Sequence, residues 1–184
     1  MKMLAVVGSP RKGGNTDVLI DQLISGAAGA GAEVEKIYLN DLKITPCQAC
    51  YACKKKPGCV IQDDMQKLYP KVLAADAILF GTPVYWWTVS AQMKLFLDRW
   101  FALMDADYQS LVKGKRAALA VVCQDPDTKG MTAPIIHMFK EGMEFIGVKY
   151  MGEVTASCDK KGEVAENATA MRAARELGRR TAQA

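Results

Sequence analysis

The sequence predicts an α/β fold: a doubly wound parallel sheet of five strands, in the order 2-1-3-4-5, enclosed by helices in three α/β/α layers. Short apolar runs alternate with longer amphipathic segments along the 184 residues, as in sheets whose parallel strands are joined by crossover helices. The first, third and fourth runs are almost wholly apolar, as central strands buried on both faces should be. The second run contains Glu33, Glu35 and Lys36, so it is expected near an edge.

The first three elements come from the N-terminal forty residues. Residues 2–8 form a short apolar run and are expected to be the first strand. Asn15 or Thr16 is expected to cap a helix that ends at about Gly29, because both side chains can accept a backbone N–H at a helix start. Residues 33–39 hold β-branched and aromatic side chains and are expected to be the second strand.

The middle of the chain is interrupted by cysteines. Residues 40–62 show no periodicity and are expected to be irregular. A helix should run from about Asp63 to Ala75, with Asp63 and Asp64 at its start, where carboxylates interact favourably with the helix dipole. Residues 77–81 are apolar and are expected to be the third strand.

The remaining elements alternate regularly. Residues 90–104 place apolar side chains on one helical stripe, which predicts a strong amphipathic helix. A fourth strand is expected at 116–123, a helix at 131–146, a fifth strand at 148–157 and a closing helix at 163–182.

Length and composition limit the function classes. We expect residues 1–184 to form a single domain with a cysteine-rich insert at about 45–62. The net charge of +4 is no signature of nucleic-acid binding, and no apolar run approaches the roughly 20 residues of a membrane span. We therefore expect a cytoplasmic protein with neither nucleic acid nor membrane as partner. Six cysteines in that reducing compartment favour metal ligands or buried thiols over disulfides.

A glycine-rich loop follows the first strand and reads GSPRKGGNT from Gly8. The loop and the helix start behind it offer backbone N–H groups and a positive dipole end to an anion. We expect a terminal phosphate monoester there, held by Ser9, Arg11, Gly14, Asn15 and Thr16. The loop matches neither the dinucleotide fingerprint nor the nucleoside-triphosphate loop. The alternative is an ordinary glycine-rich turn without a ligand.

Two further loops should lie at the same edge of the sheet, since ligands of such sheets bind at the carboxyl ends of the strands. The segment after the third strand ends in three consecutive aromatic residues, which can wall a flat aromatic ligand or pack in the core or a subunit interface. Its candidate residues are Thr82, Pro83, Val84, Tyr85 and Trp86. The segment 124–130, after the fourth strand, could complete the edge of the site.

Four cysteines lie within thirteen residues, in a C-x2-C-x2-C-x5-C pattern: Cys47, Cys50, Cys53 and Cys59. Successive x2 spacing favours a [4Fe–4S] cluster, as in ferredoxins. A structural zinc site and free thiols are the alternatives. By contrast, Cys123 and Cys158 are expected to be small buried side chains.

Three groups of residues together resemble the flavodoxin-like NAD(P)H-dependent FMN reductases, and the cysteine spacing resembles their iron–sulfur flavoprotein subgroup. The first group is the glycine-rich loop and the second is the cysteine run with Asp63-Asp64-Met65. The third is Thr82-Pro83-Val84-Tyr85 with the downstream Lys94, Phe96, Asp98 and Arg99. The likeness is close over about residues 1–100 and looser beyond.

The resemblance implies FMN, with its phosphate on Ser9, Arg11, Asn15 and Thr16 and its ring beside residues 83–86. It also implies a [4Fe–4S] cluster on the four clustered cysteines, NAD(P)H as a possible co-substrate, and a homodimer or homotetramer. The expected function is an FMN-dependent electron-transfer oxidoreductase that passes electrons from ferredoxin or NAD(P)H to a quinone, an oxygen species or another acceptor. No catalytic side chain is expected, because the flavin performs the chemistry. The alternatives are a cluster-free NAD(P)H:FMN or quinone reductase, a non-enzymatic flavin electron carrier, and a zinc-stabilised scaffold without flavin.

Overall fold

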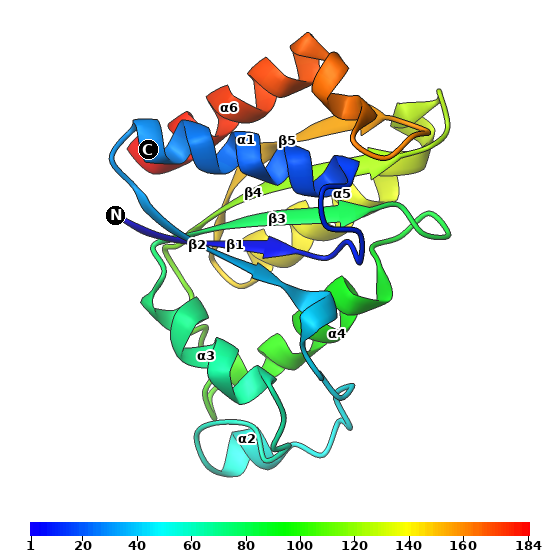
Figure 1. The fold of residues 1–184 in the computed structure, drawn as a ribbon. Coiled ribbons are helices and arrows are strands. Elements are labelled where there is room, and N and C mark those ends of the chain that lie inside the picture. The colour runs from blue at the N-terminus through cyan, green and yellow to red at the C-terminus, as the bar shows by residue number, and fades with distance from the viewer.

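A computed structural model describes residues 1–184, and its centre is a parallel sheet of five strands with helices on both faces (Figure 1). The strand order is β2-β1-β3-β4-β5, so the predicted fold class and topology are confirmed. The most polar strand, β2, lies at an edge, and the apolar strands β1, β3 and β4 lie inside. The strands are β1 (Lys2–Val7), β2 (Glu33–Tyr38), β3 (Ala77–Pro83), β4 (Arg116–Cys123) and β5 (Lys149–Ser157).

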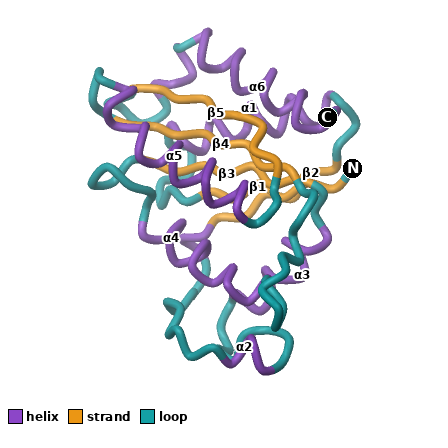
Figure 2. Tube along the Cα trace, turned by 180° about the vertical axis from the view of Figure 1, so that it is seen from behind, coloured by secondary structure: helices purple, strands orange, loops and turns teal.

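Six α-helices and three short 3₁₀ helices connect these strands (Figure 2). The α-helices are α1 (Asn15–Gly29), α2 (Ala52–Lys55), α3 (Met65–Ala74), α4 (Ala91–Asp98), α5 (Thr128–Phe145) and α6 (Ala168–Gln183). The 3₁₀ helices are η1 (Leu39–Asp41), η2 (Arg99–Leu103) and η3 (Glu163–Glu166). None of the helices combines the length and the apolar composition needed to traverse a lipid bilayer.

One face of the sheet is covered by α1 and α6, which pack against each other very closely. A side-chain carbon on Gly178 of α6 would lie 2.0 Å from the Leu23 carbonyl oxygen of α1. The same atom on Gly26 would lie 1.8 Å from the carbonyl oxygen of Arg175. Real carbon–oxygen contacts are much longer, so only glycine permits this helix crossing.

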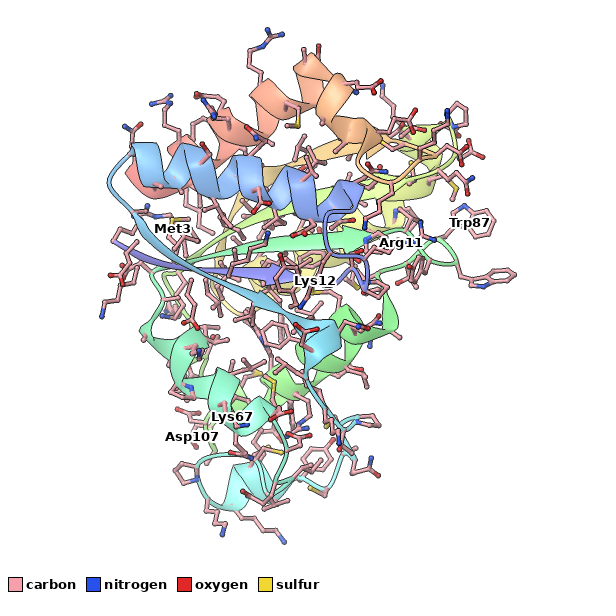
Figure 3. All side chains as sticks on the ribbon, in the orientation of Figure 1. Met3, Arg11, Lys12, Lys67, Trp87 and Asp107 are labelled. Atoms are coloured by element: carbon pink, nitrogen blue, oxygen red, sulfur yellow. The ribbon has the colours of Figure 1, made fainter.

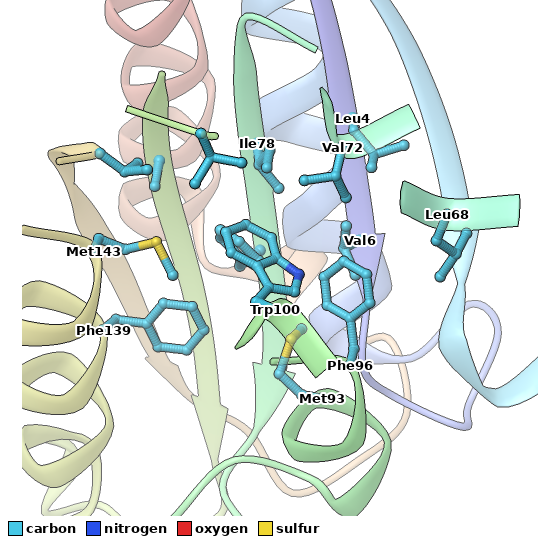
Figure 4. Close-up of a cluster of buried hydrophobic side chains, with 14 of the residues drawn as sticks. Leu4, Val6, Leu68, Val72, Ile78, Met93, Phe96, Trp100, Phe139 and Met143 are labelled. Carbon is cyan, nitrogen blue, oxygen red and sulfur yellow. The ribbon is translucent and has the colours of Figure 1, made fainter. Parts of the chain in front are cut away.

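The other face is covered by α3, α4, η2 and α5, which share a large apolar cluster with the sheet (Figure 4). Phe80 on β3 contacts Trp100 of η2 and Phe139 of α5, with ring centroids 5.8 and 5.1 Å apart. Burial of such aromatic side chains contributes roughly 1.5–3 kcal/mol each. This cluster therefore fixes η2 against the sheet, at the base of the cysteine segment.

Several helix starts differ from those predicted. Neither Asn15 nor Thr16 caps α1, since Gly14 occupies the N-cap position and no side chain caps the helix. Asp127 accepts the Gly130 N–H at 3.1 Å, so α5 starts at Thr128 rather than at 131. Asn167 caps α6 through the Ala170 N–H, which divides the predicted closing helix into η3 and α6.

The predicted helix 90–104 ends its regular part at Asp98 and tightens into η2. Lys54 binds the end of η2: its Nζ donates to the carbonyl oxygens of Phe101 (2.8 Å) and Met104 (2.6 Å). Helix-terminal carbonyls otherwise lack partners. The predicted irregular segment likewise contains η1 and the single turn α2, which lies at the tip farthest from the sheet (Figures 1 and 2).

Candidate functional site

An open cleft of about 270 Å³ lies where β1, β3 and β4 end. It is lined by eight of the ten residues predicted to bind the cofactor: Ser9, Arg11, Gly14, Asn15, Thr16, Pro83, Val84 and Tyr85. The loop after β1 and the loop after β3 come together here, as expected for the switch point of a doubly wound sheet.

The helix start at the bottom of the cleft offers free donors to an anion. The backbone N–H groups of Asn15, Thr16 and Asp17 make no hydrogen bond within the protein, and the first intrahelical bond is Val18 N–H to the Gly14 carbonyl oxygen at 2.9 Å. Gly14 is needed for this geometry, since a side-chain carbon there would lie 2.9 Å from the Arg11 carbonyl oxygen. Free N–H groups at the positive end of a helix bind phosphate and carboxylate groups.

The loop itself is fixed by buried polar contacts. The Ser90 hydroxyl donates to the Gly8 carbonyl oxygen at 2.7 Å, and the Gly13 N–H donates to Asp17 at 2.7 Å. Burial raises the pKa of Asp17, but hydrogen bonds from Lys36 and Gly13 outweigh it and lower that pKa below its usual value. Lys36 lies 2.5 Å from the Asp17 carboxylate and so compensates a negative charge that would otherwise repel an anion.

Two predicted phosphate ligands behave differently. Arg11 makes no ion pair and is exposed at the cleft, so its guanidinium is available to a ligand (Figure 3). The side chain of Asn15 is already engaged, since its amide donates to the Lys160 carbonyl oxygen at 2.8 Å and accepts the Val164 N–H at 3.1 Å. Asn15 can therefore offer its backbone N–H, while its side chain ties two distant loops together.

Thr82 and Trp86 do not line the cleft. Thr82 is fully buried: its hydroxyl accepts the Ser90 N–H at 3.0 Å and donates to the Pro83 carbonyl oxygen at 2.9 Å. That hydroxyl positions the start of α4, and its one hydrogen is already donated, so it has no donor left for a ligand. Trp86 extends into solvent with 86% of its surface exposed.

The aromatic segment forms a tight two-residue turn. Tyr85 and Thr88 exchange backbone hydrogen bonds of 2.9 and 3.0 Å, and Trp86 and Trp87 between them have φ angles of 50° and 57°. Left-handed backbone is unfavourable for such bulky side chains. The turn nonetheless leaves both indoles exposed, and Trp87 lies at the same end of the sheet as Arg11 (Figure 3).

The cleft also has a wall of which the sequence predicted only the part after β4. The ends of β4 and β5 contribute Val122, Cys123, Gln124, Cys158, Asp159 and Lys161. Cys123 and Cys158 are buried as expected, but they lie at the cleft. Of the segment expected to complete the site, only Gln124 lines it.

The four clustered cysteines line one small, separate pocket, together with Arg99, Phe101 and Ala102. Burial raises the pKa of the Cys53 thiol, and the charges of Cys59 and Cys47 raise it further while Lys54 lowers it. All four thiols are free. They do not approach closely enough to form a metal-binding group of three or more side chains. The four candidate ligand atoms are nonetheless all sulfur, which suits an iron–sulfur cluster or zinc.

A buried ion pair holds this pocket on the protein. Arg99 is 1% exposed, and its Nη1 lies 2.6 Å from the Asp63 carboxylate and 2.8 Å from the Thr45 carbonyl oxygen. Its Nη2 lies 3.4 Å from the Cys59 sulfur. The sequence places Asp63 at a helix start, and the family resemblance includes both Asp63 and Arg99 without pairing them. The partner of Asp63, Arg99, lies 36 residues away and could not be identified from local spacing.

Comparisons with known proteins agree with this geometry. The sequence profile of the family described as NADPH-dependent FMN reductase matches residues 1–163. An iron–sulfur flavoprotein of Methanosarcina thermophila is 35% identical over 149 residues, which cover 80% of this chain and 78% of the relative. An iron–sulfur flavoprotein of Archaeoglobus fulgidus is 38% identical over 122 residues, 66% of this chain but only 54% of the relative. The chain thus spans about half the length of that relative.

Among solved structures, the Trp repressor binding protein from Bacillus subtilis superposes with a TM-score of 0.73 and 29% sequence identity. The superposition covers 95% of this chain and 99% of the other. The predicted resemblance is therefore confirmed for nearly the whole chain, including the region beyond residue 100.

Proposed function

The chain belongs to the NADPH-dependent FMN reductase family, and on this premise we propose that it is an FMN-dependent electron-transfer oxidoreductase whose flavin occupies the cleft at the end of β1. The observation that supports this most is the set of three unpartnered N–H groups at the start of α1, beside the unpaired Arg11. A phosphate monoester satisfies these donors, and the aromatic Tyr85 lies within reach of a ring attached to it.

The chain's own residues have a binding and positioning role in this reaction. Ser9, Arg11 and the N–H groups of Asn15 and Thr16 would hold the phosphate, and Pro83, Val84 and Tyr85 would line the ring. When bound, FMN supplies hydride and single-electron chemistry. The positive end of α1 and the loop N–H groups stabilise negative charge on a ligand without reorganising. No side chain of the cleft is needed as a general acid or base.

We further propose that Cys47, Cys50, Cys53 and Cys59 hold a [4Fe–4S] cluster, supported by the shared pocket of four sulfurs and by the names of the relatives. Arg99 donates toward the Cys59 sulfur and would stabilise it as a thiolate ligand. A cluster would let a one-electron donor of the ferredoxin type feed the flavin, and NAD(P)H is the other donor. A quinone, an oxygen species or another acceptor would then receive the electrons.

The proposal includes one domain over residues 1–184, in which the insert at about 45–62 serves the metal site. It also includes a homodimer or homotetramer, because Trp86 and Trp87 are 86% and 53% exposed and indoles so exposed usually meet another surface. Six free thiols suit a reducing compartment such as the cytoplasm.

One experiment tests the core of this proposal. The protein, purified without oxygen, should bind one FMN per chain, contain iron and sulfide in equal amounts, and oxidise NADPH or reduced ferredoxin in the presence of a quinone. FMN binding without iron would identify the protein as a cluster-free reductase. FMN binding without turnover would identify it as an electron carrier. A chain that binds zinc and no flavin would refute the proposal.

A further inference from the structure

The loop between β5 and η3 covers the phosphate-binding loop, although the two lie about 145 residues apart in the sequence. Gly162 has a left-handed φ of 80°, and a side-chain carbon on it would lie 3.7 Å from the Gly13 carbonyl oxygen. Asn15 ties the two loops together through the Lys160 carbonyl oxygen and the Val164 N–H. The distant loop is therefore part of the wall of the cleft.

Lys161, in that loop, places the end of its side chain near Gly13. A side-chain carbon built on Gly13 would lie 3.7 Å from Cε and 4.0 Å from Nζ of Lys161. The same residue lines the cleft. Its ammonium group makes no ion pair and no hydrogen bond with the protein, so its three donors are available.

Hydrogen bonds hold the backbone of the loop that carries Lys161. Glu163 accepts the N–H groups of Asp159 and Lys160, each at 2.7 Å. Both hydrogen bonds are accepted by Oε2 and lower the pKa of Glu163. Glu163 makes no ion pair with Lys161. The backbone on both sides of Lys161 is thereby fixed, and only the side chain remains to adapt to a ligand.

The lysine of the phosphate loop itself makes its contacts outside the cleft. Lys12 belongs to the phosphate loop itself, yet its Nζ lies 2.6 Å from Asp41 and 4.8 Å from the centre of the Tyr38 ring. It points toward β2, away from the cleft. Arg11 is then the single cation that the first loop contributes, while a phosphate monoester carries a charge of about −1.5 to −2 at neutral pH.

From these contacts we propose that Lys161 supplies the second positive charge for the FMN phosphate, so that the loop between β5 and η3 forms one side of the phosphate site. This inference rests on the proposed function and extends it: it assigns recognition of the phosphate to a residue of the C-terminal third of the chain. A cation at this position discriminates the phosphorylated flavin from riboflavin, because riboflavin lacks the negatively charged phosphate with which the Lys161 ammonium would pair.

The test compares Lys161→Met with Lys160→Met, a neighbouring exposed lysine of the same loop, in titrations of the flavin-depleted full chain with FMN and with riboflavin. We expect Lys161→Met to raise the Kd for FMN about tenfold or more, the size of one charge-assisted hydrogen bond. Its Kd for riboflavin should change less than twofold. Lys160→Met should leave both values within twofold, and Lys161→Arg should restore most of the FMN affinity.

The dependence on salt gives an independent measurement. Loss of one phosphate contact should make the Kd for FMN less sensitive to NaCl in Lys161→Met than in the unsubstituted chain. Equal weakening of FMN and riboflavin, or an FMN affinity that matches Lys160→Met, would overturn the role of Lys161 while the flavin site stands. An unsubstituted chain that binds neither flavin overturns the proposed function and this inference with it.

Discussion

Replacement of Asp63 by asparagine should reveal how strongly the cysteine insert depends on one buried ion pair. The Asp63 carboxylate lies 2.6 Å from Arg99, and the two side chains are 7% and 1% exposed. The substitution preserves the shape of the side chain but keeps only one acceptor oxygen. That oxygen can accept the Thr45 N–H, which lies 2.7 Å from Oδ2, or the Met65 N–H, which lies 3.0 Å from Oδ1, but not both. It also removes the charge, and leaves the Arg99 guanidinium buried without its counter-ion.

The expected cost is large because the remaining cation is already poorly satisfied. Nε of Arg99 has no hydrogen-bond partner, and removal of one member of a buried ion pair typically costs about 3–5 kcal/mol. For a chain of this size, that corresponds to a fall of roughly 6–20 °C in Tm. Chemical denaturation of the purified variant, followed by circular dichroism, measures the loss directly.

Asp64→Asn is the matched control. Asp64 pairs with Lys67 at 2.7 Å, but Lys67 is 76% exposed on its side chain, and exposed pairs contribute no more than about 1 kcal/mol. If Asp63→Asn loses no more stability than Asp64→Asn, the Arg99 pair does not hold the insert and our reading of it is wrong.

The pH dependence provides a second measurement with a defined sign. Burial raises the pKa of Asp63, but hydrogen bonds from Arg99, Thr45 and Met65 outweigh it and lower that pKa below its value in the unfolded chain. The pair therefore contributes stability above about pH 4, and the contribution is lost as the pH falls through the lowered pKa. The difference between the unsubstituted chain and Asp63→Asn should shrink over that acidic range; a constant difference would contradict the assignment.

Three other substitutions test the remaining parts of the structure. Arg11→Ala should weaken FMN binding by about 1.5–3 kcal/mol, the value of a charge-assisted hydrogen bond, and an unchanged Kd would exclude Arg11 as a phosphate ligand. Cys50→Ser should lower the iron content without loss of FMN, and full iron retention would refute the ligand set. Gly178→Val should destabilise the chain by about 3 kcal/mol or more, since its side chain would collide with the Leu23 carbonyl. Gly142→Ala is the control, because nothing lies within 4 Å of that position and alanine favours the helix.

The fold was predictable because its main signals are local. Each central strand is an uninterrupted apolar run, and β2 is marked as an edge strand by its charged residues. The glycine-rich loop and the four cysteines were recognisable for the same reason, since each motif lies within a few consecutive residues.

The parts that sequence reasoning missed depend on contacts between distant segments. Asn15 was predicted as a phosphate ligand, but its side chain binds residues 145 and 149 positions away. Thr82 was predicted to contact the ligand, yet its buried hydroxyl accepts the Ser90 N–H instead. Lys161 lies in no motif of the sequence, and only its position near Gly13 distinguishes it. No periodicity or spacing carries this information.

The segment formed by α4 and η2 connects the two candidate sites, and this restricts how the protein can change during evolution. At its start Ser90 binds the carbonyl of Gly8, and eight helical residues later Arg99 enters the cysteine pocket. Insertion or deletion of one residue between them would rotate Arg99 by about 100° around the helix axis while Ser90 stayed in place. Neighbouring loops can lengthen or shorten among homologues, but the length of this helix should be invariant wherever both sites are retained.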